Sequence, residues 1–417
     1  MKKELSTLQN TVYNTLGSGF YLVCTWVITV LAVRLGSVEA GGVLSLAMSV
    51  TNIFYTLSVF GVRTYQVSDY DRKYETGDYT AARLITGLAA LALCAGYSFL
   101  SPEYSRYEAA CVTVYMLFRT GEAFSDENQA LQQVAGRMDY VCWSFLIRGV
   151  CVLGSFIAAF PWTGSLLWAF GAMAASTGLA VLLFEVPVSR RLAPGPWRFR
   201  PAVVRALLKE NLPLLANTLI MVLMVSWPRT RLNALWGNYW MGIYGSVAAP
   251  AAIMQSAALW LFLPSLSLFA RYWSEGDRRA YDRLHRRIML LLGGLSAVVL
   301  AGAWLLGRWG LNLLFGAEIA SHAGLLLPTL ATTILIAGEY YLASLLTAAR
   351  KMKAIVISNL AGLGLTFLLA DPLIRPYGAE GVNLTVCLAM GVNCLLLYGA
   401  LLQARRRHFG KEEKQAG

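Results

Sequence analysis

Long apolar runs alternate with short polar and charged segments along the whole chain. A membrane-spanning helix needs roughly 20 residues to cross about 30 Å of hydrocarbon, and most of the runs approach that length. The connections between the runs are short, and none is long enough to form a soluble domain. The pattern predicts about twelve membrane-spanning helices, over residues 12–33, 42–66, 84–100, 108–130, 141–160, 165–187, 211–234, 242–268, 288–306, 322–347, 354–370 and 382–403.

The composition points to the same class of protein. Hydrophobic residues make up 57% of the 417 residues and charged residues only 14%, whereas an average soluble domain has about 25% charged residues. A water-soluble fold of this length cannot bury so many apolar side chains. We therefore expect an all-α polytopic membrane protein.

Lysine and arginine are distributed unevenly among the connections. If the N-terminus is cytoplasmic, the cytoplasmic segments hold 26 of the 35 Lys and Arg residues, and the outer segments hold four, Arg34, Arg106, Arg308 and Arg375. Because these residues accumulate in cytoplasmic loops, we expect both termini to be cytoplasmic. The net charge of +12 then reflects orientation and attraction to anionic membrane lipids, and it requires no nucleic acid.

Short matches between the two halves of the chain suggest an internal repeat. Gly77-Asp78 recurs as Gly276-Asp277, and Asn14-Thr15-Leu16 recurs as Asn217-Thr218-Leu219. Convergent loop chemistry is the alternative explanation. Because six spans in each half is an even number, repeated halves enter the membrane from the same side and are parallel. We expect two parallel six-helix bundles around a central cavity, residues 1–188 and 211–417, joined by a cytoplasmic linker, residues 189–210.

Five arginines fall inside the predicted spans: Arg63, Arg119, Arg148, Arg229 and Arg231. An arginine at the centre of a lipid-facing helix costs roughly 2.5–3.5 kcal/mol on insertion scales. These residues should therefore face a water-filled cavity or an acidic partner. For those near a helix end, the alternative is a side chain that extends to the membrane surface.

The fourth predicted span carries the densest charge. Its uninterrupted apolar run covers only residues 109–118, so the helix must include Arg119, Glu122 and Asp126 to cross the membrane. These residues are spaced three and four apart and share one helical face. That face lines a cavity or pairs internally, with Arg119 and Glu122 as the obvious pair. A short, tilted span is the alternative. Glu185 and Glu339 are further acids within the spans.

This inventory suggests a site for an anionic cargo. Arginine binds phosphate groups through a planar fork and stays charged, so the five arginines are the candidate contacts to an anionic head group. Glu122, Asp126 and Glu339 are candidates for binding a coupling H⁺ or Na⁺, or for internal pairing. The seven cysteines lie in apolar runs without metal-ligand spacing, and no phosphate-binding glycine loop is present. We expect no cofactor, no metal and no catalytic residue.

Several short motifs resemble one known family. They are Val33-Arg34-Leu35-Gly36, Gly136-Arg137-Met138-Asp139-Tyr140 followed by Ser144 and Arg148-Gly149, and Gly242-Ile243-Tyr244. The sequence resembles the polysaccharide flippases of the MOP (multidrug/oligosaccharidyl-lipid/polysaccharide) superfamily, which includes the Wzx-type exporters of O-antigen and capsule and the MATE-like transporters. The similarity covers the whole chain in the number of spans and in the two halves.

The resemblance implies a function. It indicates a flippase of the bacterial inner membrane that moves an undecaprenyl-pyrophosphate-linked oligosaccharide to the outer leaflet by alternating access, alongside other polysaccharide-assembly proteins. It also implies a cationic central cavity. Arg148 matches the family by its spacing from the Arg-Met-Asp run, whereas Arg63 and Arg119 match by span and residue type. Relatives often carry an Asp-Arg pair in the seventh span, where this chain has Thr230-Arg231.

Three alternative functions stay open at this point. A multidrug exporter of the same superfamily would favour cationic drugs and a cavity dominated by carboxylates, and a major-facilitator carrier would share the parallel halves. A membrane enzyme of polysaccharide assembly would need acids in long outer loops or a deeply buried histidine. The outer loops are short, and His285, His322 and His408 all lie outside the predicted spans or at their boundaries. We therefore expect a transporter and not an enzyme.

Overall fold

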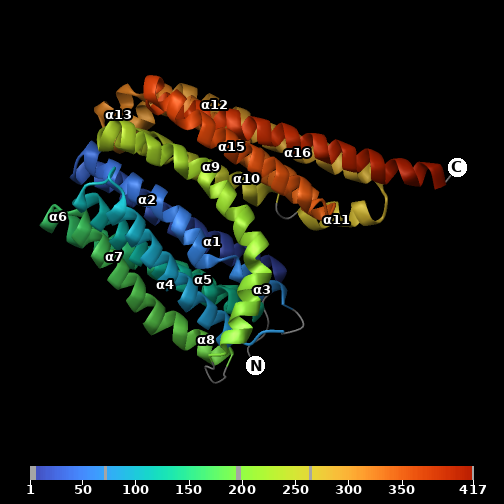
Figure 1. Ribbon diagram of the computed structural model, residues 1–417, viewed down its shortest axis with the longest axis horizontal. Helices are drawn as coiled ribbons and strands as arrows, with labels where there is room; N and C mark the ends of the chain where they lie inside the picture. Colours follow the sequence, from blue (N-terminus) through green and yellow to red (C-terminus); the bar gives the residue numbers. More distant parts are fainter. Residues whose placement is uncertain (1–5, 70–72, 194–198, 263–264, 416–417) are drawn as a thin grey trace. The chain divides into compact units, whose positions relative to one another are not determined.

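The computed structural model describes residues 6–69, 73–193, 199–262 and 265–415, and the regular structure in these ranges is entirely helical (Figure 1). The chain divides into two compact units, Met1–Val222 and Leu223–Gly417. The all-α class predicted from the sequence is thus confirmed for the described ranges. The boundary between the units falls inside a single long helix, α9.

Unit 1 is a bundle of helices that run alongside one another (Figure 1). Helix α5 is in the middle of this packing, because it contacts α2, α4, α6 and α7, while α1 packs along α6. The helices are α1 (Thr7–Leu35), α2 (Val38–Val59), α3 (Val62–Ser68), α4 (Thr76–Leu100), α5 (Arg106–Val134), α6 (Met138–Thr163), α7 (Leu166–Ala180), a π-helical segment (Val181–Glu185), α8 (Val186–Leu192) and the first turns of α9 (Pro201–Ala248).

Side-chain caps define where these helices begin. Ser105 accepts a hydrogen bond from the backbone of Glu108, whose carboxylate accepts one from the backbone N–H of Ser105 in return. Glu75 and Asp78 form the equivalent box at the start of α4. Such reciprocal bonds satisfy N–H groups that have no partner within the helix. The box at Glu75 starts α4 eight residues before the apolar run begins at Leu84.

The core of unit 1 is apolar at one end and polar along the second half of α5. Phe118, Phe156 and Phe170 are at most 1% exposed and pack together with residues of α2 and α4. Further along α5, buried side chains include Glu122, Ser125, Glu127, Asn128, Gln129 and Gln132. A helix with so many buried polar groups can cross a membrane only when protein surrounds it. The packing of α5 meets that requirement.

The corner between α2 and α3 holds the first turns of α9. Phe60 and Gly61 both have left-handed backbone conformations, with φ of 50° and 68°. The corner forms a small apolar core with α9, which comprises Val62, Tyr74, Tyr79, Ala82, Val204 and Leu207. Beside that core, Lys73 Nζ lies 2.5 Å from Glu210 Oε1, and Arg200 forms an ion pair with the fully buried Asp78.

The predicted linker, residues 189–210, is therefore helical at both described ends, and its last ten residues pack on unit 1. Residues 194–198 of the linker lie outside the described ranges. The domain boundaries predicted from the sequence stay a prediction. Near this corner, burial raises the pKa of Asp69, but hydrogen bonds from the Tyr79 hydroxyl and from the backbone of Lys73 and Tyr74 outweigh it and hold that pKa below its ordinary value.

Unit 2 contains the second part of α9 and the remaining helices. Helices α14 and α15 pack against α16, and α12 contacts α10, α11 and α14. Phe262, Tyr281 and Tyr341 belong to a buried apolar cluster of unit 2. The elements are α10 (Ala251–Phe262), α11 (Leu266–Ser274), α12 (Arg278–Phe315), α13 (Ala317–Ser321), a 3₁₀ turn (Ala323–Leu325), α14 (Leu326–Ala348), α15 (Met352–Tyr377) and α16 (Ala379–Gln415).

Ten helices in the described ranges are long and apolar enough to cross a membrane. The predicted count of twelve is thus not confirmed, for two reasons. The charged α5 is not among the ten, and the predicted span 242–268 covers only the last turns of α9, the short α10 and the start of α11, with residues 263–264 outside the described ranges. Within α9, Gly237, with φ of 78° and ψ of −178°, breaks the helix into two segments. The other predicted spans fall largely on helical structure.

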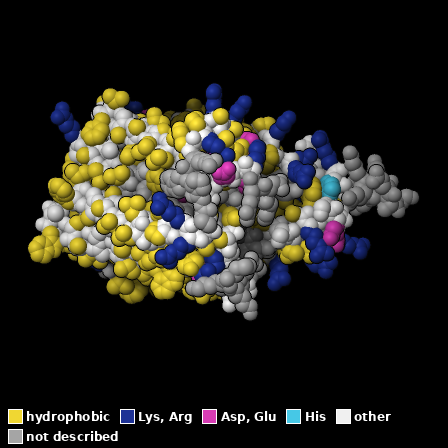
Figure 2. All heavy atoms as spheres, turned by 90° about the horizontal axis from the view of Figure 1, so that it is seen from below, with side chains coloured by type: hydrophobic (Ala, Val, Ile, Leu, Met, Phe, Trp, Pro, Cys, Tyr) yellow, Lys and Arg dark blue, Asp and Glu magenta, His cyan; other side chains and the backbone are white. Residues whose placement is uncertain are grey.

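The surface has the properties of a protein embedded in lipid. Figure 2 shows hydrophobic side chains spread over much of the visible face. In α12, Leu290, Val298 and Trp304 are each at least 70% exposed, which would be unfavourable in water but suits contact with acyl chains. Lys and Arg gather at the end of unit 2 that carries α11 and the C-terminus (Figures 1 and 2). The chain is a multi-pass membrane protein.

We predict that Gly61→Ala destabilises the protein by about 1–3 kcal/mol, because a side chain disfavours the left-handed conformation. Its Cβ would also lie 2.7 Å from Leu214 Cδ2 of α9. Thermal unfolding of the purified protein in detergent measures the effect. Gly96→Ala in α4 is the matched control, since its Cβ meets no atom within 4 Å and alanine favours a helix. Equal melting temperatures for the two variants would contradict the prediction.

Candidate functional site

Four arginines and three carboxylates meet around the second half of α5 in unit 1. They come from α3, α4, α5, α6 and the π-helical segment; Asp126 and Glu122 each contact two of the arginines, and Glu185 contacts one. We call this group the arginine cluster; its members are Arg63, Arg83, Arg119, Arg148, Glu122, Asp126 and Glu185.

Asp126 joins two guanidinium groups from different helices. Arg63 Nη1 lies 2.8 Å from Asp126 Oδ1, and Arg83 Nη2 lies 3.1 Å from Asp126 Oδ2. Arg83 also donates to the backbone oxygen of Ser58 at 2.9 Å, and it is fully buried. Arg63 donates further to Gln133 at 3.0 Å. One carboxylate therefore fixes α3 and α4 against α5.

Glu122 is the second shared carboxylate. It forms an ion pair with Arg119 and accepts a hydrogen bond from the Tyr21 hydroxyl of α1. Arg148 Nη1 lies 4.0 Å from Glu122 Oε1. The guanidinium of Arg119 stacks over the ring of Tyr55, 3.9 Å from its centroid, which adds a cation–π contact. The pairing of Arg119 with Glu122 that the sequence suggested is present.

Glu185 holds the deepest arginine. Its Oε1 lies 3.3 Å from Arg148 Nε and accepts hydrogen bonds from Ser125 and Ser144. Both Glu185 and Arg148 are buried. Glu185 is the last residue of the π-helical segment Val181–Glu185. Such segments insert an extra residue into a helix and are frequent at functional sites, and here the segment places a carboxylate beside Arg148.

Accessibility divides the arginine cluster into two parts. Arg83, Arg148 and Glu185 have side chains that are at most 4% exposed, so their ion pairs mainly hold the helices together. Arg63, Arg119 and Asp126 keep 28%, 21% and 21% of their side-chain surface exposed. With all groups ionised, four positive charges meet three negative ones. The accessible part therefore combines an excess of positive charge with guanidinium groups that a ligand can reach.

The remaining predicted arginines lie in unit 2. Arg231 makes two contacts to Asp371 of α15, Nε to Oδ1 at 2.7 Å and Nη2 to Oδ2 at 2.9 Å. This is the bidentate geometry in which arginine binds planar anions. Arg229 lies over the ring of Tyr244, 5.6 Å from its centroid. The carboxylate beside Arg231 therefore comes from another helix, α15, and not from position 230, which is a threonine.

Glu339 is isolated from these ion pairs. It lies on α14 with only 2% of its surface exposed. Its Oε2 has no hydrogen-bond partner among the described residues, and no ion pair to it is found there. The structure thus brings together Arg63, Arg119, Arg148, Glu122 and Asp126 in unit 1, whereas the Arg231 pair and Glu339 are separate features of unit 2.

One member of the arginine cluster lies outside the predicted spans. The predicted span 84–100 begins just after Arg83, but α4 begins at Thr76, so Arg83 lies two turns inside the helix and is fully buried. The capping pair Glu75 and Asp78 was the signal that could have revealed the earlier helix start. The contributions of Tyr21 and Tyr55 and the partner Asp371 were also missed, because they depend on which helices become neighbours.

We predict that Asp126→Asn destabilises the protein by about 3 kcal/mol or more, because it leaves the buried Arg83 without its counter-charge. Thermal unfolding in detergent measures the loss. The control is Glu275→Gln, which removes the acid of the exposed Arg271–Glu275 pair, whose two atoms are 2.7 Å apart. Exposed pairs contribute little to stability, so this variant should unfold like the unsubstituted protein. A loss of similar size in both variants would show that the Asp126 contacts are not structural.

Comparison with known proteins agrees with this architecture. Residues 7–265 match the model of the family described as polysaccharide biosynthesis protein. No curated protein gives a significant match. A lipid II flippase, MurJ, in an inward closed conformation has a similar fold, with a TM-score of 0.73 at 9% sequence identity, covering 97% of this chain and 90% of that chain.

Two transporters are similar in the same way. An inward-facing multidrug resistance MATE family transporter of the MOP superfamily has a TM-score of 0.67 at 12% identity, covering 100% of this chain and 97% of its own. A MOP superfamily transporter from Pyrococcus furiosus, described as having a binding pocket of reverse polarity, has a TM-score of 0.58 at 11% identity, covering 96% and 94%. Such low identities establish the fold alone. The family match covers more than half of the sequence, so this chain belongs to the polysaccharide biosynthesis protein family and has the fold of MOP superfamily transporters.

Proposed function

We propose that this protein is a flippase that moves an undecaprenyl-pyrophosphate-linked oligosaccharide across the bacterial inner membrane by alternating access, for the assembly of cell-surface polysaccharide. Membership of the polysaccharide biosynthesis family supports the pathway. The fold shared with a lipid II flippase supports the type of transport. Both termini are cytoplasmic in this proposal, in line with the excess of Lys and Arg in the segments on that side.

The observation that carries the proposal is the accessible part of the arginine cluster. Arg63 and Arg119 are exposed enough to be reached, and each is held by a carboxylate, Asp126 or Glu122. A pyrophosphate group offers the same kind of oxygen acceptors as a carboxylate, with more negative charge. The head group of the cargo can therefore take the place of Glu122 on Arg119, or of Asp126 Oδ1 on Arg63, while Asp126 Oδ2 stays paired with the buried Arg83.

This exchange also suggests how transport is coupled to an ion. While Glu122 is ionised, it competes with the head group for Arg119. Once Glu122 takes up H⁺ or binds Na⁺, it no longer competes, and Arg119 is free to hold the cargo. Asp126 can release Arg63 through one oxygen while the other stays paired with the buried Arg83. Ion and cargo then favour the same state, which is the thermodynamic requirement for coupling between two sites. Glu339 is a further candidate for the coupling ion, because it is buried without a counter-charge among the described residues.

A drug exporter is the main competing function, since MATE transporters share the fold. The surplus of arginine over carboxylate in the cluster disfavours a cationic cargo. Arg231 with Asp371 forms a second bidentate pair, and Arg229 lies in the same stretch of α9. We infer that these arginines contribute further contacts to the anionic cargo.

We predict that the double variant Arg63→Gln, Arg119→Gln lowers transport at least about tenfold, because charge-assisted hydrogen bonds contribute about 1.5–3 kcal/mol each and 1.4 kcal/mol is a factor of ten. The assay follows a fluorescent undecaprenyl-pyrophosphate-linked saccharide between the leaflets of liposomes that contain the purified protein. Bacteria that carry the variant should accumulate lipid-linked sugar in the inner leaflet.

Two controls make this result specific. Arg106→Gln removes an exposed arginine at the start of the same helix and should leave transport unchanged. The double variant with lysine at both positions keeps the charge, and it should recover part of the activity. Thermal unfolding checks that each variant is folded. Transport at the normal rate by a folded double glutamine variant would overturn the proposal, and so would transport of cationic drugs with no movement of the lipid-linked saccharide.

A further inference from the structure

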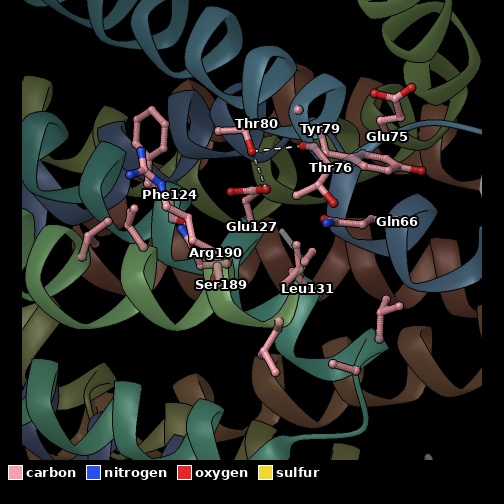
Figure 3. A pocket seen from close by; sticks show the side chains of 18 of the residues that line it. Gln66, Glu75, Thr76, Tyr79, Thr80, Phe124, Glu127, Leu131, Ser189 and Arg190 are labelled. Carbon is pink, nitrogen blue, oxygen red and sulfur yellow. Dashed lines mark hydrogen bonds between the residues drawn. The ribbon is translucent and has the colours of Figure 1, made fainter. Parts of the chain in front are cut away.

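A separate cavity lies at the end of unit 1 where α3, α4, α5 and α8 meet (Figure 3). Its volume is about 920 Å³. The arginine cluster does not line it, so the proposed cargo site does not account for it. Gln66, Thr80, Glu127, Asn128, Ser189 and Arg190 supply polar groups to its wall. We call it the α5–α8 cavity.

Glu127 is the most unusual group in the wall. Its side chain is buried, with 2% of its surface exposed. It accepts a hydrogen bond from Thr80 Oγ1 at 2.9 Å, and no ion pair to it is found in the described part of the chain. The preceding residue, Asp126, is in contrast paired with two arginines. A buried carboxylate without a counter-charge is unfavourable, so the cavity favours a ligand that carries positive charge.

Two further polar atoms in the wall are unsatisfied. Gln66 Oε1 and Ser189 Oγ are buried and have no hydrogen-bond partner among the described residues. Figure 3 shows the amide end of Gln66 directed toward the Glu127 carboxylate. An amide oxygen and a carboxylate that face one space can both accept from a single N–H donor group. Nearby, Asp69 is already satisfied, because it accepts from the Tyr79 hydroxyl at 2.7 Å and from two backbone N–H groups.

The opposite wall is apolar and reaches the outer surface of the bundle. Leu131 and Val134 of α5 line it together with Val181 and Leu182 of the π-helical segment. Val134 is 54% exposed and Leu182 64% exposed. On the same helix, Leu183 is 75% exposed. These residues lie in membrane-spanning segments, so this edge of the cavity opens toward acyl chains.

We propose that the α5–α8 cavity binds a phospholipid whose head group carries a primary ammonium, as phosphatidylethanolamine does. The ammonium lies against Glu127 and Gln66, Arg190 at the rim contacts the phosphate, and the acyl chains pass Val134 and Leu182 into the bilayer. The requirement for a primary ammonium follows from the acceptors, because a quaternary choline group has no N–H to donate. This site is distinct from the proposed cargo site, since a pyrophosphate-linked sugar has no ammonium for Glu127.

A metal ion explains the cavity less well. No group of three or more His, Cys, Asp or Glu residues that could hold a metal occurs among the described residues. The apolar wall would also give a metal ion nothing to bind. An anionic lipid would place negative charge next to Glu127, which is unfavourable in a low dielectric. A lipid with an ammonium head group fits both walls: the ammonium contacts the polar wall, and the acyl chains contact the apolar wall.

The test is a competition between lipids. Full-length protein in detergent is equilibrated with equal amounts of phosphatidylethanolamine, phosphatidylcholine and phosphatidylglycerol, and native mass spectrometry counts the lipids that stay bound. We expect phosphatidylethanolamine to be retained about tenfold more than phosphatidylcholine, the effect of one charge-assisted hydrogen bond. Glu127→Gln should abolish this preference. Glu39→Gln neutralises an exposed acid in the first turn of α2, a helix that does not line the cavity. This control variant should keep the preference.

A second variant tests whether a loss of lipid binding comes from the cavity or from misfolding of the protein. Leu182→Trp fills the cavity from its exposed edge and leaves Glu127 in place, so it should lower retention of phosphatidylethanolamine while the protein stays folded. Equal retention of phosphatidylethanolamine and phosphatidylcholine by the unsubstituted protein would overturn the proposal, as would an unchanged preference in Glu127→Gln. If soluble glycerophosphoethanolamine competes as strongly as the intact lipid, the site binds a free amine and the assignment to a lipid is wrong.

Discussion

A charged side chain inside a membrane is stable only when protein groups replace the water that it has lost. In this chain the constraint falls on α5, which carries Arg119, Glu122, Asp126 and Glu127 within nine positions. Several helices pack around it, and the partners of its charges come from α1, α2, α3, α4 and α6. The arrangement of unit 1 follows from this requirement: most helices that pack on α5 also supply a group that its charges need.

The same requirement relates stability to function. Ion pairs that are fully buried, such as Arg148 with Glu185, are expensive to break and hold the bundle together. Those that are partly accessible, such as Arg63 with Asp126, can exchange one anionic partner for another. The proposed transport function would need both kinds: ion pairs that keep the bundle intact and contacts that change during the cycle. The unequal exposure of neighbouring pairs provides this division within one network of side chains.

Much of the architecture could be predicted from local sequence. The apolar runs located the helices, and the spacing of Arg119, Glu122 and Asp126 identified the helix that could not face lipid. The helix α4 begins eight residues before the predicted span 84–100, because the apolar run begins after the cap, so Arg83 fell outside the predicted span. Partners such as Asp371 and Tyr21 could not be predicted, because pairing across 140 or 101 positions depends on which helices pack together. Helix α9 consists of two helical segments because Gly237 has a non-helical backbone conformation, which the sequence does not specify.

Asp126 and Glu127 are consecutive residues, yet they face different surroundings. Successive side chains on a helix point about 100° apart, so one enters the arginine cluster and the other enters the α5–α8 cavity. Both are fixed to the same rigid backbone, so a rotation of α5 that loosens Asp126 from Arg63 must also displace Glu127. In the proposed function, a lipid bound beside Glu127 would therefore influence the ion pairs on the other side of α5. Through this single helix, the proposed transport rate would depend on the lipid composition of the bilayer as well as on the protein.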